Sequence, residues 1–463
     1  MIATIGIVLV IYFLGMVFIG WYGRTRTKDF ESYLNMGRSG GVLLLMGGCI
    51  GGQVGNGFVV GGAAEGSVVG MAGASYGLAC ALACFLVAFL LNDFIYKGNY
   101  MSLAQYCHRR YTSHVPGTIY DLSTAISSIG LIAGQIMAGK ALFETLGFSG
   151  TLGAISIAVV VLLYSQMAGL WGAFATSVIQ TGIILVGLIT TTFLLIGRGA
   201  IGTINNAVAA GTASPSALNF EGMATAAVIG LVVPLFLGMV TDQPTFQRVN
   251  SAKSAKISKI ACILSGLVMI PLALMPPFIG SYGAVVHGAS GGNAFFITIM
   301  QELPAIACAL IIAAVIAAVM STIDCGIITM STVLTRDIWQ TALKKNPDEK
   351  QLKNITLGVN IVFLGVSTVL ALSATSIIGL LGAVYSFLAA ACFVPFAGGV
   401  LWKKGNTYGA TAASAVGVCT VIATWLGLSL PMASIFPILP SAIAYIIVSL
   451  ATQGKVPQTA AAQ

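Results

Sequence analysis

The feature that most constrains this chain is a succession of apolar runs, each about 20 residues long or longer, separated by short polar segments. A helix needs about 20 apolar residues to cross the hydrocarbon core of a bilayer. Across the 463 residues, 57% are apolar and 7% are charged. Soluble domains carry about 25% charged residues, and so few polar side chains could not cover a water-exposed surface. We therefore expect an all-α polytopic membrane protein.

The polar segments divide the chain into thirteen candidate membrane helices. Only Met167-Ala168-Gly169 separates the fifth candidate from the sixth. If the N-terminus lies outside, the 21 Lys and Arg residues fall in inner segments, except for the outer Arg198 and the intramembrane Lys140. The positive-inside rule then predicts a multi-pass protein of the plasma (inner) membrane with a cytoplasmic C-terminus. The candidates are 2–22, 41–66, 69–96, 118–145, 149–167, 170–197, 222–242, 255–283, 302–335, 354–373, 376–402, 407–427 and 432–452.

Several functional classes lack their sequence signatures. The nine cysteines lie mostly in apolar runs, without metal-ligand spacing. A phosphate-binding Gly-Lys-Ser/Thr loop is missing, and no histidine has the context of a catalytic triad. The formal net charge of +8 comes from basic residues that lie mostly in the predicted inner loops. Membrane topology therefore explains the charge, and we expect no nucleic-acid partner. We also expect no enzymatic activity and no organic cofactor. The apolar N-terminus lacks a cleavage site and is interpreted as a retained span.

A glycine-rich segment predicts an interrupted helix in the second span. Gly47–Gly57 holds six glycines in eleven residues, together with Gln53 and Asn56. Each glycine costs about 1 kcal/mol relative to alanine inside a helix. Broken helices near the membrane midplane are typical of secondary transporters, because their freed backbone groups bind ions and substrate. The alternative is close helix packing through small residues.

The seventh span contains Val233-Pro234 and ends in Thr241-Asp242-Gln243-Pro244, which predicts a second break. The alternative is an ordinary proline kink. The two interrupted spans lie five helices apart, and an odd number inverts the second copy of a repeat. We therefore expect two inverted five-helix repeats, each led by a broken helix. The expected divisions are a peripheral helix and loop at 1–40, repeats at 41–200 and 201–402, and two peripheral helices with a tail at 403–463.

Five segments, in order along the chain, resemble the sodium/solute symporter family, which includes proline, pantothenate, galactose and sialic acid symporters. The resemblance implies a leucine-transporter-like fold of thirteen spans and sodium as the coupling ion. The segments are Tyr33–Arg38 (YLNMGR), Tyr164–Gln180 (YSQMAGLWGAFATSVIQ), Gln243–Lys253 (QPTFQRVNSAK), Ala317–Asp324 (AAVMSTID) and Gly399–Ala410 (GVLWKKGNTYGA).

The resemblance also implies a sodium site between the first and eighth core helices. Its ligands would be the backbone carbonyls of Gly51, Val54 and Ala318 and the hydroxyls of Ser321 and Thr322. Sodium is a hard cation that takes oxygen ligands, so this ligand set agrees with the chemistry. The alternative for the two hydroxyls is a hydrogen bond to a carbonyl one turn earlier in their own helix.

The sequence departs from the family pattern at two positions. The family's Thr-Asp pair on the fifth core helix is Thr176-Ser177 here, whereas Asp324 supplies a carboxylate on the eighth. Asp324 lies three residues after Ser321, on nearly the same helix face. An intramembrane acid is functional by default. Three interpretations stay open for Asp324: a second sodium site, a protonatable coupling group or a structural partner for a cation.

We expect a secondary active transporter in which sodium drives symport of a small polar solute by alternating access. Gln243-Pro244 resembles the family's amino-acid and carboxylate members more than its sugar members, which implies an amino acid or organic acid as the solute. Lys140 either pairs with Glu144 or anchors a substrate carboxylate, and Asp242 either gates or lies solvated beside Arg248. The alternatives are a proton-coupled symporter that uses Asp324, or a channel-like facilitative carrier. The candidate cavity residues are Gln53, Asn56, Phe58, Gln135, Lys140, Tyr385 and Ser386.

Overall fold

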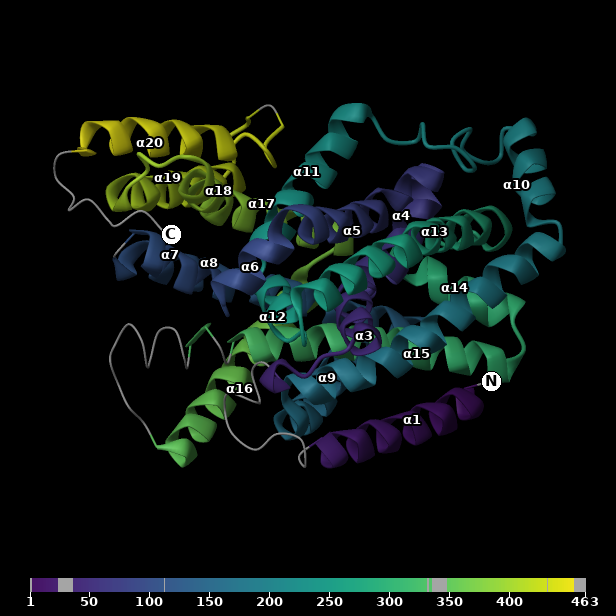
Figure 1. Cartoon of the computed structure of the whole chain (residues 1–463). Helices are drawn as coiled ribbons and strands as arrows, with labels where there is room; N and C mark the ends of the chain where they lie inside the picture. The colour runs from purple at the N-terminus through teal and green to yellow at the C-terminus, as the bar shows by residue number, and fades with distance from the viewer. Residues whose placement is uncertain are drawn as a thin grey trace.

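The protein is an all-α membrane protein whose long helices run side by side (Figure 1). This architecture follows from the sequence, because a backbone in lipid must satisfy its polar groups internally. Within the described residues, an isolated β-bridge joins Gly40 to Ala252. The computed structural model describes residues 2–23, 36–111, 113–330, 333–334, 348–430 and 432–453.

The first half of the bundle contains the first predicted broken helix. A π-helical turn at Gly57–Gly61 precedes α4, and another at Val87–Leu91 joins α5 to α6. Gly70 separates α4 from α5 with a φ of 62°, close to the predicted boundary between the second and third spans. The helices are α1 (Ile2–Gly23), α3 (Val42–Gln53), α4 (Gly62–Val69), α5 (Ser75–Leu86), α6 (Asn92–Gly98), α7 (Leu103–Tyr111), α8 (His114–Thr145), α9 (Gly150–Gly197) and α10 (Ala200–Ala209).

The second half begins after the loop that follows α10. A π-helical turn at Ala389–Phe393 joins α17 to α18. The helices are α11 (Thr225–Thr241), α12 (Gln243–Asn250), α13 (Ala255–His287), α14 (Ala294–Glu302), α15 (Ala305–Met330), α16 (Glu349–Ser373), α17 (Ile377–Leu388), α18 (Val394–Leu401), α19 (Thr407–Trp425) and α20 (Ile438–Ala451).

The predicted count of thirteen membrane helices is not confirmed. In the described part of the chain, eight helical segments are long and apolar enough to cross a membrane, and the bent pair α11–α12 makes a ninth. The predicted break at Met167–Gly169 is not seen, because α9 is a continuous helix of 48 residues. Shorter apolar helices lie at four other predicted spans, namely Ile2–Gly15, Val42–Gln53, Gly150–Leu162 and Ile438–Ala451.

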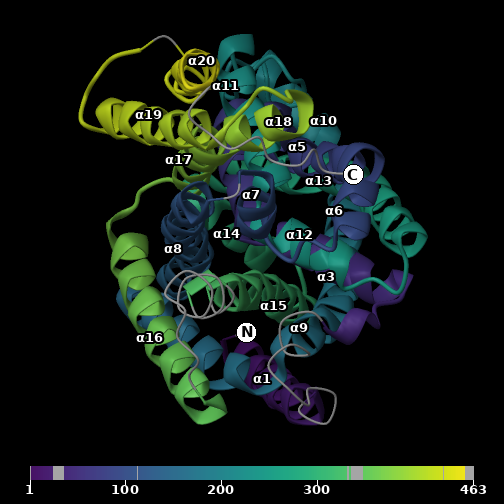
Figure 2. The ribbon, with the colours of Figure 1, turned by 60° about the vertical axis from the view of Figure 1, so that its left-hand side comes forward.

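Helix α15 is the axis of the bundle. It packs against α1, α3, α8 and α9, and Ala317 and Ala318 at its middle are fully buried. In both views α1 and α16 lie on the side of the bundle away from α19 and α20 (Figures 1 and 2). Because it is enclosed from several sides, α15 can hold polar groups away from both water and lipid.

Candidate ion site and central cavity

The glycine-rich segment does interrupt its helix. Helix α3 ends at Gln53, and Val54 leaves the helical conformation with φ −82° and ψ 60°. The backbone N–H of Asn56 donates to Gln135 Oε1 at 2.7 Å, and the Asn56 amide donates to the Gly134 carbonyl. Side chains and backbone of α8 thus satisfy polar groups that the break releases. The predicted interruption is confirmed.

The alternative role of these glycines, close packing, is also present. A Cβ at Gly48 would lie 2.7 Å from the Phe174 ring, and one at Gly51 would lie 2.7 Å from Ser177 Cβ. Both distances are too short for a side chain, so α3 approaches α9 through its glycine face. The same segment therefore packs against α9 and opens its backbone at the next turn.

Two hydroxyls of α15 meet the end of α3. Ser321 Oγ lies 2.7 Å from the Gly51 carbonyl oxygen, and Thr322 Oγ1 lies 3.1 Å from it. The same hydroxyls lie 3.0 and 3.1 Å from the Ala318 carbonyl oxygen. Each hydroxyl therefore bonds to a carbonyl of its own helix, as the alternative interpretation predicts, and also contacts the carbonyl at the end of α3.

This group places four of the five predicted sodium ligands together, namely the carbonyls of Gly51 and Ala318 and the two hydroxyls of α15. Val54, whose carbonyl is the fifth predicted ligand, has a ψ of 60°, which turns that carbonyl out of the helical direction. Gly55 lies against the group, because a Cβ there would be 2.8 Å from Thr322 Oγ1. The chemistry of a hard cation fits this all-oxygen set.

The second broken helix bends at Asp242, and not at Pro234, which was one of the two residues that predicted the break. Helices α11 and α12 meet at an angle of 48°, with Asp242 between them in an extended conformation. Pro234 lies inside α11, which continues through it. Pro244 lies in the first turn of α12, where a missing N–H is tolerated. The proline at the start of the new helix, not the one inside the old helix, marks the break.

A central cavity lies between the two broken helices. The space free of protein atoms in and around it is about 550 Å³, open solvent included, and Thr322 of the ion group is part of its wall. Three predicted cavity residues reach it: Gln53, Gln135 and Tyr385. The full lining is Gly52, Gln53, Tyr76, Ser128, Leu131, Ile132, Gln135, Asp242, Pro244, Arg248, Thr322, Cys325, Gly326, Thr329 and Tyr385.

The other predicted cavity residues lie behind this wall or away from it. Asn56 is fully buried against α8, and Phe58 and Ser386 are 2% and 5% exposed. Lys140 Nζ lies 3.4 Å from the Leu372 carbonyl oxygen of α16 and does not line the cavity. Among the described residues, Lys140 and Glu144 form no ion pair within 4.0 Å.

The cavity contains an arginine that the sequence does not predict there. Arg248 is expected in an inner loop, whereas the structure places it on α12, with 6% of its surface exposed, in the cavity wall. Asp242 lines the same cavity and lies close enough to Arg248 to interact electrostatically. The signal for Arg248 is its place in the Gln243–Lys253 family motif, which marks the segment as functional but does not show which face of α12 lines the cavity.

Asp324 lies outside this cavity lining. It is 3% exposed on α15 and close enough to Tyr12 of α1 to interact electrostatically. The Gln180 amide of α9 donates to Tyr12 Oη at 2.9 Å. The hydroxyls of Thr176 and Ser177 both donate to the Ala173 carbonyl. Asp324 therefore faces the α1–α9 side of its helix.

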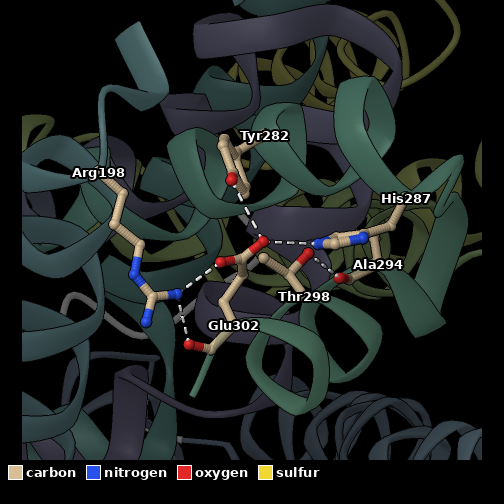
Figure 3. Close-up of polar contacts among 6 residues, drawn as sticks. All are labelled: Arg198, Tyr282, His287, Ala294, Thr298 and Glu302. Atoms are coloured by element: carbon tan, nitrogen blue, oxygen red, sulfur yellow. Dashed lines mark hydrogen bonds and ion pairs between the residues drawn. The ribbon is translucent and has the colours of Figure 1, made fainter. Parts of the chain in front are cut away.

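A second polar cluster lies at the end of the bundle near α10 and α14 (Figure 3). Arg198 Nη1 lies 2.7 Å from Glu302 Oε2, and His287 Nε2 lies 2.9 Å from Glu302 Oε1. Burial raises the pKa of Glu302, but hydrogen bonds from Arg198, His287 and Tyr282 outweigh it and lower the pKa below its ordinary value. The cluster ties the end of α9 to the ends of α13 and α14.

Comparison with known proteins decides the family. A model of the sodium:solute symporter family matches residues 33–417. The chain belongs to this family. Sodium-coupled symport is the activity that the membership supports, with sodium as the coupling ion. The family's members are transporters.

Individual relatives differ in how much of their length is matched. The chain is 26% identical over 449 residues to the sodium/proline symporter of Escherichia coli (strain K12), across 90% of this chain and 88% of that one. It is 28% identical over 275 residues to high-affinity choline transporter 1 of Torpedo marmorata, across 56% of this chain and 47% of that one. The chain thus spans about half the length of the choline transporter that it matches.

The fold is shared with solved transporters. The structure of a substrate-bound, outward-open Na⁺-coupled sialic acid symporter superposes with a TM-score of 0.79 and 21% identity, over 97% of this chain and 98% of that one. A nucleobase-cation-symport-1 family transporter superposes with a TM-score of 0.62 and 13% identity, over 92% and 96% of the two chains. At these identities the likeness establishes the fold alone.

Proposed function

We propose that this family member carries a small polar solute, an amino acid or organic acid, together with sodium by alternating access. The observation that carries the proposal is the position of Thr322. Its hydroxyl belongs to the oxygen group that joins α15 to α3, and the residue also lines the central cavity. An ion and a solute bound side by side would each stabilise the other, which is the coupling that symport needs.

The proposed sodium ligands are the carbonyls of Gly51, Val54 and Ala318 and the hydroxyls of Ser321 and Thr322. The contacts between α3 and α15 support this set, because the ion would replace hydrogen bonds across that interface. For Asp324, a second sodium site, a proton-coupling role and a structural role remain the three proposals. Its position beside α1 and α9 supports a site separate from the first.

The proposed moving parts are the inverted repeats at 41–200 and 201–402, flanked by peripheral segments at 1–40 and 403–463. The two breaks support this division, since one lies near the start of each repeat. We also propose that the N-terminus lies outside and the C-terminus in the cytoplasm, and that the protein does no covalent chemistry.

The first experiment is thermal unfolding of the purified protein in detergent against sodium, with potassium and N-methylglucamine at equal ionic strength. A ligand at about 100 times its dissociation constant stabilises a protein by about 2.7 kcal/mol. We expect stabilisation by sodium, and loss of it in Thr322→Ala. The matched control is Thr368→Ala, because that hydroxyl bonds only one turn back in α16.

The competing mechanisms give different results. Proton coupling predicts that neither sodium nor potassium stabilises the protein, and that uptake follows a proton gradient and fails in Asp324→Asn. These results together would overturn sodium coupling. Sodium-independent uptake that lacks saturable counterflow would indicate a channel-like carrier instead.

A further inference from the structure

The central cavity contains one buried cation and one carboxylate, both from the second broken helix. Asp242 lies at the bend between α11 and α12, and Arg248 lies on α12. In the described part of the chain, the ion pairs within 4.0 Å involve other residues, so the two groups share a cavity without forming a closed salt bridge. The Nε of Arg248 is buried and has no hydrogen-bond partner among the described residues.

The position of the guanidinium depends on a glycine. A Cβ at Gly52 would lie 2.1 Å from Arg248 Nη2, so any side chain there would displace the arginine. Gly52 is in the last turn of α3, one residue after the carbonyl of the proposed ion site. The first broken helix therefore makes room for the charged group of the second.

The remaining neighbours of Arg248 do not balance its charge. Arg248 also lines a second pocket, whose wall contains Cys49, Cys84 and Cys262. The Cys325 thiol lies within hydrogen-bonding reach of the guanidinium. Thiols are weak partners, and a buried guanidinium without a close carboxylate is strongly destabilising. A ligand carboxylate would supply the missing charge through two parallel hydrogen bonds.

We propose that the transported solute is a small zwitterion, whose carboxylate binds Arg248 and whose cationic nitrogen faces Asp242. This inference rests on the proposed function and names its substrate class. A simple anion would meet the carboxylate of Asp242, and a simple cation would meet Arg248. A sugar would bring no opposite charge to either group. A zwitterion alone matches both signs.

The rest of the cavity suits such a ligand. Gln53 and Gln135 offer amides, and Tyr76 and Tyr385 offer hydroxyls on aromatic rings. The carboxylate would lie near the sodium ion at Thr322, so sodium would tighten its binding by direct attraction.

The test compares solutes that differ by one charge, using thermal unfolding of the wild-type protein in saturating sodium. The probes are the proteinogenic amino acids and glycine betaine as zwitterions, isobutyrate as a carboxylate without a cation, choline as a cation without a carboxylate, and glucose as a neutral solute. We expect at least one zwitterion to raise the melting temperature and the other three probes to have no effect.

A response to isobutyrate, choline or glucose without a zwitterion response would overturn the proposal. So would the absence of any response in protein that sodium still stabilises. Neither result affects the sodium site. Loss of the sodium effect itself would instead mark a failure of the proposed function, so the two failures are distinguishable.

Variants then test the two charges. We expect Arg248→Gln and Asp242→Asn each to weaken zwitterion binding by about 30-fold or more, since each removes one partner of a buried charge pair. Sodium alone should still stabilise both proteins, because neither residue belongs to the ion group. Arg109→Gln, which removes an exposed arginine of α7, is the matched control and should bind normally.

Selectivity separates binding from a structural role. In Asp242→Asn, the preference for the zwitterion over its carboxylate analogue should fall, because the group that rejects a simple anion is gone. Equal loss of both ligands in that variant, with the preference unchanged, would show that Asp242 only supports the fold and would overturn its assignment.

Discussion

At the scale of single residues, the ion site depends on the absence of a side chain at Gly55. A Cβ there would lie 2.5 Å from Gln135 Oε1 and 2.8 Å from Thr322 Oγ1. Gln135 holds the backbone of the break, so it has little freedom to withdraw. We expect Gly55→Ala to displace the Thr322 hydroxyl and weaken sodium binding by about 10- to 100-fold, the usual effect of disturbing a ligand's support.

Sodium titrations of the melting temperature measure this change. Gly230→Ala is the matched control, since a Cβ at that position of α11 meets nothing within 4 Å. Equal sodium affinities in the two variants would mean that the hydroxyl of Thr322 does not contact the ion.

Lys140 gives a second prediction at this scale. The hydrogen bond from its Nζ to the Leu372 carbonyl holds it against α16, away from the cavity. We therefore expect Lys140→Ala to retain the solute affinity of the wild type, because the charge it removes does not face the ligand. Counterflow kinetics in proteoliposomes would check this. A rise of more than about tenfold in the half-saturation concentration would restore the alternative in which Lys140 anchors a carboxylate.

At the scale of helices, the tie around Glu302 predicts a pH dependence. The folded-state pKa of Glu302 is lower than the ordinary value, so its ionised form is favoured by folding. That stabilisation is complete above the ordinary pKa and is lost as the pH falls through the folded value. We expect Glu302→Gln to lower the melting temperature at about pH 7, and the difference from the wild type to be smaller at about pH 4 and to shrink further as the pH falls. Glu221→Gln, at an exposed loop carboxylate, should show no difference at either pH.

Sequence reasoning predicted an all-α membrane fold and both broken helices, whereas its count of thirteen spans is not confirmed and its errors have local causes. The glycine-rich segment predicted the interruption at Val54, because glycines destabilise a helix interior and helix packing alone does not explain the two amide side chains beside them. Pro234 was a poorer guide, since a proline inside a helix can be tolerated while the chain bends at the next cap. The inward turn of Arg248 was missed because a positive charge after a span usually marks a loop. The face of α12 that lines the cavity is set by packing against α3, so the sequence of α12 alone does not show which face this is.

At the scale of the whole molecule, the two ends of the described chain lie at opposite ends of the bundle. Helix α1 begins on the right of Figure 1, where α10 also lies, and α20 ends on the left. An odd number of crossings requires this arrangement. Together with the positive-inside rule it predicts that the loop after α10 is external and that the loop between α18 and α19 is cytoplasmic.

Cysteine labelling on intact cells tests that orientation. Thr212 and Lys403 are exposed residues of the two loops. We expect a membrane-impermeant maleimide to label Thr212→Cys in intact cells and Lys403→Cys only after the cells are opened. The parent protein measures background, because its native Cys419 is exposed on α19 whereas the other eight cysteines are buried. The reverse pattern would place the N-terminus inside, and Arg198 with the Glu302 tie would then face the cytoplasm. Labelling of both positions in intact cells would mean an even number of crossings between α10 and α19, and with it a different division of the repeats.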